Sequence, residues 1–300
     1  MKQITEPYFS IILPTYNRSE FIGDTIKSIK TQTFHDFELI IVDDGSTDNT
    51  HQIVTPFLNE KIKYFKQQNR ERGAARNFGV KKSNGTYITF LDSDDLLYHN
   101  HLQVAKDYIE KHPNTSIFHS GYEIKNNLGK VLGTQDCSKI DINRALLAGN
   151  PLSCIGVFLK KEIAQEFPFN ENRDMAGSED WELWVRIACH YQIQCTGKIT
   201  ASLIHHEERS VINIKNDKII ERINLAFQEI SSYPPFIKKY GQFLTWVQSH
   251  LFLYLSLHLA LDKSKKTSIY YLWKAIQLSP PNAFSYKTAG ILKALIKSLA

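Results

Sequence analysis

Residues 85–95, Gly-Thr-Tyr-Ile-Thr-Phe-Leu-Asp-Ser-Asp-Asp, join an apolar run of strand length directly to three carboxylates. Tyr87–Leu91 predicts a buried strand, with Asp92 at the point where that strand ends. Two earlier apolar runs, Tyr8–Leu13 and Phe37–Val42, are likewise followed by polar or acidic residues. Because ligands of open α/β sheets bind at the carboxyl ends of the strands, we expect these three strand ends to form one site.

Helix-length amphipathic stretches alternate with the apolar runs through the first half of the chain. This alternation predicts an α/β fold in which helices cover a mostly parallel sheet. A short further strand is expected at Ile62–Phe65, a β-hairpin around residues 126–129 and a helix at Glu179–His190. The helices expected in the first half are Ser19–Thr31, a segment that reaches about Leu58, Gly73–Lys82 and His101–His112.

The charge of the chain is unevenly distributed. Of its 300 residues 42% are hydrophobic and 22% charged, which is typical of a globular protein and excludes disorder. The formal net charge is +5, yet residues 231–300 hold nine lysines and one aspartate, so the first 230 residues are net acidic. We therefore expect an α/β domain at 1–230 and a basic helical region of about three helices at 231–300. An acidic body argues against nucleic-acid binding.

The cysteines and the first residues bear on the compartment. Cys137, Cys154, Cys189 and Cys195 lack metal-ligand spacing, so a reducing compartment is expected. The first 30 residues lack the apolar segment of a secretory signal. A cytoplasmic location is the resulting expectation.

The clustered carboxylates favour a divalent cation. Grouped carboxylates repel one another unless a cation compensates them. Asp92, Asp94 and Asp95 offer hard oxygen ligands that suit Mg²⁺ or Mn²⁺, which often complete their coordination with substrate phosphates. No glycine-rich phosphate loop follows the first strand, so a phosphate ligand would also need basic side chains. Arg76 is one candidate, and a solvated helix arginine is the alternative.

An ordered set of motifs resembles the family 2 glycosyltransferases of GT-A fold, which transfer a sugar from a nucleotide diphosphate sugar with inversion. The set covers residues 8 to about 210, and its order makes it specific although each motif alone is weak. It consists of Pro14–Arg18, Gln32–Phe34, Glu38–Asp48, Gly73–Gly79, Gly85–Asp95 and Glu179–Trp184.

The resemblance implies a nucleotide-sugar donor site at the strand ends. Asp44 would accept a hydrogen bond from uracil, which makes a UDP-sugar the expected donor. Asp92 would lie by the ribose, and the Pro-Thr-Tyr-Asn segment would border the base. The donor-binding residues implied are Pro14, Tyr16, Arg18, Asp44, Arg76, Asp92 and Ser93.

The resemblance also implies the metal ligands and the base. Asp94 would bind Mn²⁺ or Mg²⁺ together with His206, and His205 is the alternative because Leu203-Ile204 replaces the usual Tyr-Arg. Asp180 would act as general base on the acceptor hydroxyl in a single displacement. Ser178 is expected to cap that helix, and a helix-start acid without catalytic role is the alternative for Asp180.

Two other functions compete with this reading. One is a non-catalytic nucleotide-sugar-binding protein, and the other is a nucleotidyltransferase on a similar sheet.

Two tryptophans follow Asp180 in the expected helix. Trp184 is expected in the core, and Trp181 either there or against a sugar.

The acceptor and the role of the tail are expected by analogy. A glycan or lipid-linked acceptor in cell-surface polysaccharide synthesis is the expectation. Phe243–Leu261 carries no formal charge, and a buried helix is favoured over a membrane span. Phe284–Ala300 is amphipathic and is expected either to lie on the inner face of the cell membrane, as a peripheral contact, or to pack on its own domain.

Overall fold

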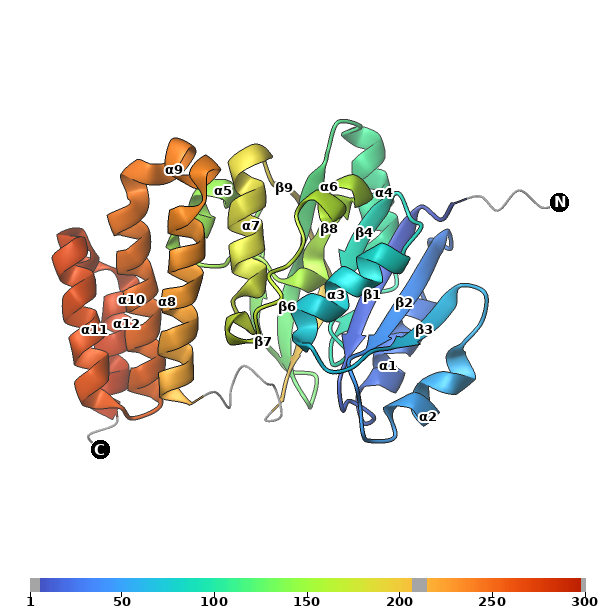
Figure 1. Ribbon diagram of the computed structural model, residues 1–300, viewed down its shortest axis with the longest axis horizontal. Coiled ribbons are helices and arrows are strands. Elements are labelled where there is room, and N and C mark those ends of the chain that lie inside the picture. Colours follow the sequence, from blue (N-terminus) through green and yellow to red (C-terminus); the bar gives the residue numbers. More distant parts are fainter. Residues whose placement is uncertain (1–5, 207–214, 298–300) are drawn as a thin grey trace.

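The computed structural model describes residues 6–206 and 215–297. One end of the molecule is a sheet covered by helices, and the other end is a group of C-terminal helices (Figure 1). The mixed sheet has nine strands in the order β3-β2-β1-β4-β8-β6-β9-β5, with β7 paired to β6. Its strands are β1 (Phe9–Thr15), β2 (Phe37–Asp43), β3 (Ile62–Lys66), β4 (Tyr87–Phe90), β5 (Leu96–Leu97), β6 (Ile117–Asn126), β7 (Val131–Gln135), β8 (Val157–Lys160) and β9 (Gln194–His205).

The first four strands are parallel, as the alternating pattern predicts. Thr15 is in register with Asp43, and Asp43 with Lys66, so these strands end at one edge. β4 pairs with β1 on the other side, which brings Asp92 to the same edge. The expected α/β architecture is confirmed.

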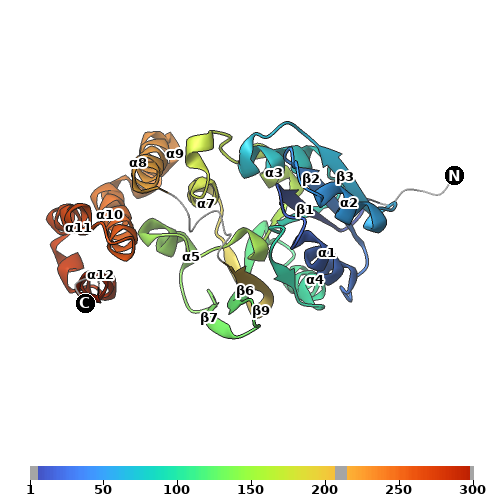
Figure 2. The ribbon, with the colours of Figure 1, turned by 90° about the horizontal axis from the view of Figure 1, so that it is seen from below.

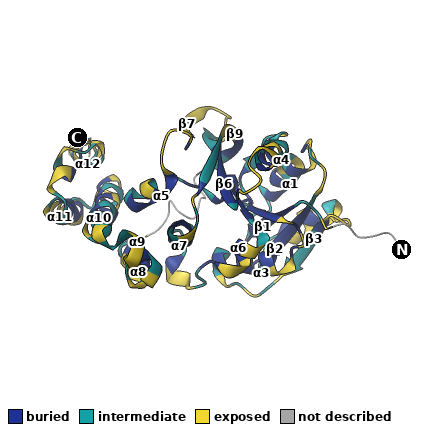
Figure 3. Cartoon of the chain, turned by 90° about the horizontal axis from the view of Figure 1, so that it is seen from above, coloured by how far each residue is buried: buried dark blue, intermediate teal, exposed yellow. Residues whose placement is uncertain are grey.

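Helices cover both faces of this sheet. The helices α1 (Ile22–Lys30) and α4 (His101–Lys111) lie on one face and α3 (Glu71–Lys82) on the other (Figure 2), with α6 (Lys161–Glu166) beside α3 (Figure 3). Alternate residues of β1 follow this division: Ile11 packs with the core that includes α1, while Ile12 packs with the core that includes α3. Burial on both faces explains the uninterrupted apolar runs (Figure 3).

Two expected helices are shorter than the sequence predicts. The first begins at Ile22 instead of Ser19, because Ser19 donates its N–H to Asp48 in a loop. The second, α2 (Thr50–Val54), changes to a 3-10 turn at Thr55, next to Pro56. Pro56 has no N–H to continue an α-helical ladder.

The remaining helices belong to the second half of the chain. The expected helix at 179–190 and the expected helical character of the tail are confirmed; where about three helices were expected after residue 231, the described part holds four. The expected boundary between residues 230 and 231 falls inside α8, so the division into units stays a prediction. The helices are α5 (Ile142–Ala145), α7 (Glu179–His190), α8 (Asn216–Ser232), α9 (Pro234–Tyr240), α10 (Leu244–Leu261), α11 (Lys265–Leu278) and α12 (Tyr286–Lys297).

The uncharged tail segment forms α10, which packs between α8, α11 and α12. Its two serine hydroxyls are satisfied internally: Ser249 Oγ donates to the Ala275 carbonyl at 2.7 Å and Ser256 Oγ to the Ser268 carbonyl at 2.9 Å. Within residues 6–206 and 215–297, none of the helices has both the length and the apolar character that a bilayer crossing requires. The buried-helix expectation is confirmed.

The close contact of α3 with β1 depends on Gly79. A Cβ there would lie 2.3 Å from Ile12 Cγ2, so Gly79→Ala should lower the free energy of unfolding by about 1–3 kcal/mol through overpacking. Gly290→Ala in α12 is the matched control, because nothing lies within 4 Å of its Cβ position and the helix propensity of alanine should add up to about 1 kcal/mol. Urea denaturation of both variants measures the difference, and equal stabilisation would contradict the packing argument.

Candidate active site

Side-chain hydrogen bonds hold the loops after β1 and β2 together. Asn17 donates its N–H to Ser46 Oγ at 2.9 Å and accepts one from the Thr47 N–H at 2.8 Å. Asp48 accepts from the Ser19 N–H at 3.0 Å and from Thr50. Burial alone would raise the pKa of Asp48, but these bonds lower it to about 2. The first two strand ends therefore form one fixed platform.

The two acids after β2 have different surroundings. Asp43 is fully buried and accepts hydrogen bonds from the Ser46 N–H at 2.7 Å and from the Tyr64 hydroxyl. Its carboxylate therefore stabilises the loop after β2. Asp44 Oδ1 accepts from Gln67 Nε2 at 2.7 Å and from the Arg70 N–H at 2.9 Å. These bonds fix the orientation of the Asp44 carboxylate, the predicted uracil acceptor.

Arg76 is the centre of a buried charge cluster. Its guanidinium donates to Asp92 Oδ1 at 2.7 Å and to Glu179 Oε1 at 2.8 Å and lies 5.1 Å from the ring centroid of Phe169. The side chain is only 2% exposed, so the solvated-arginine alternative is wrong. Arg76 thus joins the end of β4 to the start of α7.

The two acids at the start of α7 are perturbed in opposite directions. Burial raises the pKa of Glu179, but Arg72 and Arg76 more than offset it and bring this pKa below its usual range. For Asp180, burial and the neighbouring Glu179 charge outweigh Arg76 and raise the pKa to about 6. Strongly perturbed carboxylates of this kind are common at functional sites.

The position of Asp180 depends on two hydrogen bonds. Its Oδ1 accepts from the Trp181 N–H at 2.7 Å, and its Oδ2 accepts from Asn150 Nδ2 at 3.0 Å. Ser178 is the N-cap residue of α7, as predicted, although its side chain makes no capping hydrogen bond. Asn150 was not among the predicted residues, since an asparagine in a loop carries no distinguishing signal.

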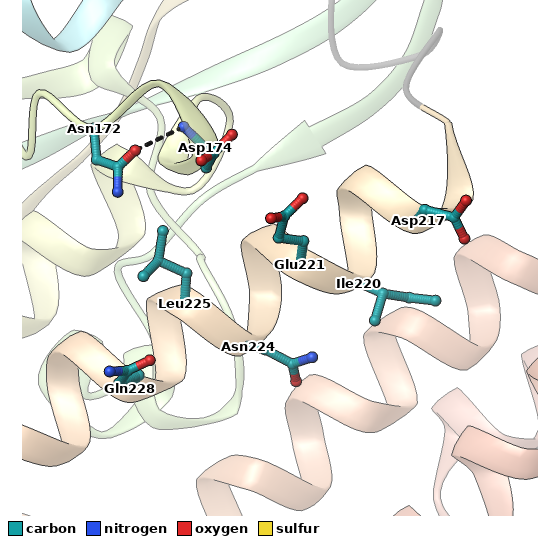
Figure 4. A pocket seen from close by; sticks show the side chains of 8 residues that line it. All are labelled: Asn172, Asp174, Asp217, Ile220, Glu221, Asn224, Leu225 and Gln228. Atoms are coloured by element: carbon teal, nitrogen blue, oxygen red, sulfur yellow. Dashed lines mark hydrogen bonds between the residues drawn. The ribbon is translucent and has the colours of Figure 1, made fainter.

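Asp180 lines a pocket of about 530 Å³ between α7, the loop at 148–151 and the tail helices. Trp181 also lines it, but the indole is 5% exposed and donates to the Leu146 carbonyl at 2.8 Å. Trp184 is fully buried, which confirms its expected place in the core. A second hollow of about 610 Å³, between the turn at residues 173–175 and the outer face of α8, contains none of the predicted site residues (Figure 4).

The residues of the acidic segment after β4 have different partners. Asp95 is 1% exposed and accepts from the Ile204 N–H at 2.9 Å, which anchors β9. Asp94 Oδ2 lies 3.1 Å from His206 Nε2 and 3.7 Å from Arg18 Nε. The buried Ser93 carbonyl accepts from Thr25 Oγ1 at 3.1 Å. The segment thus brings Asp94 and His206, the predicted metal ligands, together.

The fit of these two residues to a divalent cation rests on their spacing and chemistry. A separation of 3.1 Å is close to that of neighbouring ligands on an octahedral ion with bonds of about 2.1 Å. His206 is 4% exposed and stacks on Phe21, whereas His205 is exposed at the end of β9. In the described part of the chain no group of three such ligands occurs, so water or phosphate would complete the coordination.

The residues after β1 lie at the same edge. Tyr16 is 46% exposed, and Arg18 reaches Asp94, whereas Pro14 is buried in β1 opposite Val42. The roles of Pro14, Tyr16, Arg18 and Ser93 toward a donor stay predictions. Arg209, which could neutralise a phosphate or pair with Glu207 or Glu208, belongs to the segment at 207–214, which lies outside the described residues.

Comparisons with known proteins identify the family. A family model described as Glycosyl transferase family 2 matches residues 10–153. A protein of Escherichia coli, UDP-Glc:alpha-D-GlcNAc-diphosphoundecaprenol beta-1,3-glucosyltransferase WfgD, is 35% identical over 182 residues, which cover 59% of this chain and 68% of that protein. The chain belongs to the family 2 glycosyltransferases.

Other similarities concern length and fold. A similar stretch, 35% identical over 196 residues and 62% of this chain, occurs in the uncharacterized glycosyltransferase RC0461 of Rickettsia conorii, where it spans only 31% of the length. The structure of S. aureus TarS 1-349 in complex with UDP-GlcNAc covers 97% of this chain and 90% of its own, with a TM-score of 0.70 and 21% identity. This glycosyltransferase therefore has the GT-A fold, with the helical region after it.

The Arg76 cluster generates a stability prediction. Arg76→Met removes the cation between Asp92 and the 3%-exposed Glu179 and should cost up to about 3–5 kcal/mol, because the buried Glu179 carboxylate then keeps only Arg72, whose Nε lies 3.9 Å away. Lys27→Met removes an exposed pair with Asp24 and should change stability by less than about 1 kcal/mol. Thermal and urea unfolding at pH 7.5 compare the two, and similar costs would show that the cluster is not what joins β4 to α7.

Proposed function

We propose that this glycosyltransferase moves a sugar from a UDP-sugar to a hydroxyl of a glycan or lipid-linked acceptor in polysaccharide synthesis, with inversion at the anomeric carbon. The observation that carries the proposal is Asp180: it is partly accessible, lines a pocket and has a pKa near 6. A group with this pKa is mostly ionised at pH 7 and is a stronger base than an ordinary aspartate.

The proposed reaction uses the charged groups of the site. An ionised Asp180 accepts the proton of the acceptor hydroxyl as that oxygen attacks the anomeric carbon, and the bond from this carbon to the diphosphate breaks. Asp44 holds the uracil, and Asp92 lies by the ribose. Arg76, committed to Asp92 and Glu179, acts as a positioning residue that fixes both carboxylates.

A divalent cation is part of the proposal. Asp94 and His206 would hold Mn²⁺ or Mg²⁺, which would supply positive charge for the leaving diphosphate. Arg18, 3.7 Å from Asp94, is positioned to contribute positive charge at the same place.

The acceptor class is supported by the relative from Escherichia coli, whose name gives a diphosphoundecaprenol-linked sugar as acceptor. Peripheral contact with the inner face of the cell membrane stays a prediction. It is supported by the tail surface: Leu292 and Ile296 of α12 are 48% and 66% exposed, and Trp273 of α11 is 55% exposed. Ile291, by contrast, is buried, so only part of the expected apolar face packs on the chain itself.

Asp180→Asn tests the base. The variant should lower kcat by about 10²–10⁴-fold while UDP-sugar binding stays unchanged, and wild-type activity should fall as the pH drops below about 6, because protonation removes the base. Asp107→Asn, at an exposed position of α4, is the matched control and should behave like wild type. Steady-state kinetics between pH 5 and 8 measure both effects. Undiminished transfer by Asp180→Asn would refute the assignment, and pyrophosphate release from a nucleoside triphosphate would favour a nucleotidyltransferase instead.

The cation site has a readout independent of activity. Mn²⁺ should raise the melting temperature of the wild-type protein in the presence of UDP, and EDTA should reverse the rise. Asp94→Asn and His206→Ala should lose this response, whereas His205→Ala, at an exposed position, should keep it. If only His205→Ala lost the response, His205 and not His206 would be the metal ligand.

A further inference from the structure

The C-terminal helices contribute to the lining of the pocket beside Asp180. Asp180 and Trp181 of α7 line it together with His250 of α10 and Lys287 of α12. The same helices that the sequence marks as a separate basic region therefore complete a cavity that begins at the proposed catalytic base.

Lys287 places a cation in this pocket. Its Nζ donates to the Ala148 carbonyl at 2.6 Å and lies 3.4 Å from His250 Nδ1. Burial and the neighbouring lysine lower the pKa of His250 to about 4, so the imidazole is neutral at pH 7 and Nδ1 can accept from Lys287. Within residues 6–206 and 215–297, Lys287 forms no ion pair with a carboxylate. An ammonium group with only neutral partners is suited to an anionic ligand.

A second cation lies behind the same pocket. Arg222 of α8 is 2% exposed, and its Nη1 donates to the Ala176 carbonyl at 3.3 Å. The guanidinium lies against Gly177, which lines the pocket, and its Nε and Nη2 have no hydrogen-bond partner in the described part of the chain. Two cations without carboxylate partners thus give this side of the pocket a positive potential.

Lys287 and Asp180 line the same pocket and are held by the same short loop. Lys287 holds the carbonyl of Ala148, and Asn150, two residues later, holds the Asp180 carboxylate. A sugar whose hydroxyl lies at Asp180 therefore has its other substituents in the pocket that Lys287 also lines.

We propose that Lys287 binds the phosphate of an acceptor sugar that carries a diphosphate, so that α12 completes the acceptor site. The proposal rests on the proposed function, because it uses Asp180 as the base. Arg222 adds to the potential without contact, and the neutral His250 orients the ammonium group.

Kinetics with two acceptors test the role of Lys287. The probes are N-acetylglucosamine linked through a diphosphate to a short alkyl chain, and the neutral alkyl glycoside of the same sugar. Lys287→Ala should raise KM for the diphosphate acceptor at least tenfold and leave kcat/KM for the glycoside unchanged. Lys287→Arg should retain most of the affinity, and Lys293→Ala, at an exposed position of α12, is the matched control. An equal loss on both acceptors would overturn the proposal in favour of a structural role at the 148–150 loop.

Direct binding measurements show whether Lys287 contacts the phosphate of the acceptor or that of the donor. They also separate failure of the Lys287 proposal from failure of the proposed function. Calorimetry on the full chain measures the binding of an alkyl diphosphate without sugar. This probe should bind equally well to wild type and to Lys293→Ala, and at least tenfold more weakly to Lys287→Ala. UDP binding should be the same in all three, and a loss of UDP affinity in Lys287→Ala would assign the lysine to the donor instead. If the alkyl diphosphate binds through Lys287 but no nucleotide sugar is used by wild type, the proposed function fails and the anion site stands. Transfer with unaltered diphosphate binding in Lys287→Ala overturns only the anion site.

Discussion

The buried guanidinium of Arg76 is the interaction on which the site depends. It joins Asp92, at the end of β4, to Glu179, in the first turn of α7. Arg76 and Glu179 are 103 residues apart in the sequence. Without the guanidinium, the buried Glu179 carboxylate would lose its closest cation and the partly exposed Asp92 carboxylate would lose its partner, at a desolvation cost that falls on Glu179. Because Asp180 follows Glu179 directly, the same bond fixes where the proposed base stands relative to the carboxylates of the sheet.

The parts of this arrangement that could be predicted are local in sequence. The apolar runs that end in Asp43-Asp44 and Asp92–Asp95 report both the strands and the edge at which they end, since burial on both faces leaves little freedom in those positions. The pairing of Arg76 with Glu179 has no local signature, because a helix arginine with a solvated or a buried charge has the same sequence. Asn150 and Lys287 could not be found for the same reason: their place is set by how loops and tail helices pack.

The tail shows how composition can be right and its interpretation incomplete. Its excess of lysine is real, but Lys287 turns inward to the Ala148 carbonyl, and the hydroxyls of Ser249 and Ser256 are used inside the helical region. Helical periodicity predicts one apolar face for the last helix, yet Leu292 and Ile296 stay exposed while Ile291 is buried. Periodicity reports that a face is apolar and leaves open what covers it.

The charge balance around Asp180 is a compromise between base strength and ionisation. Burial and Glu179 raise its pKa, which strengthens the base, while Arg76 limits the rise to about 6. A higher pKa would leave the carboxyl protonated at pH 7, and a lower one would weaken its attraction for the acceptor proton. Glu179 is held ionised by Arg72 and Arg76, so its charge acts on Asp180 at every pH where the enzyme would work. The pairing that assembles the site would therefore also set the pH range in which Asp180, the proposed base, is ionised.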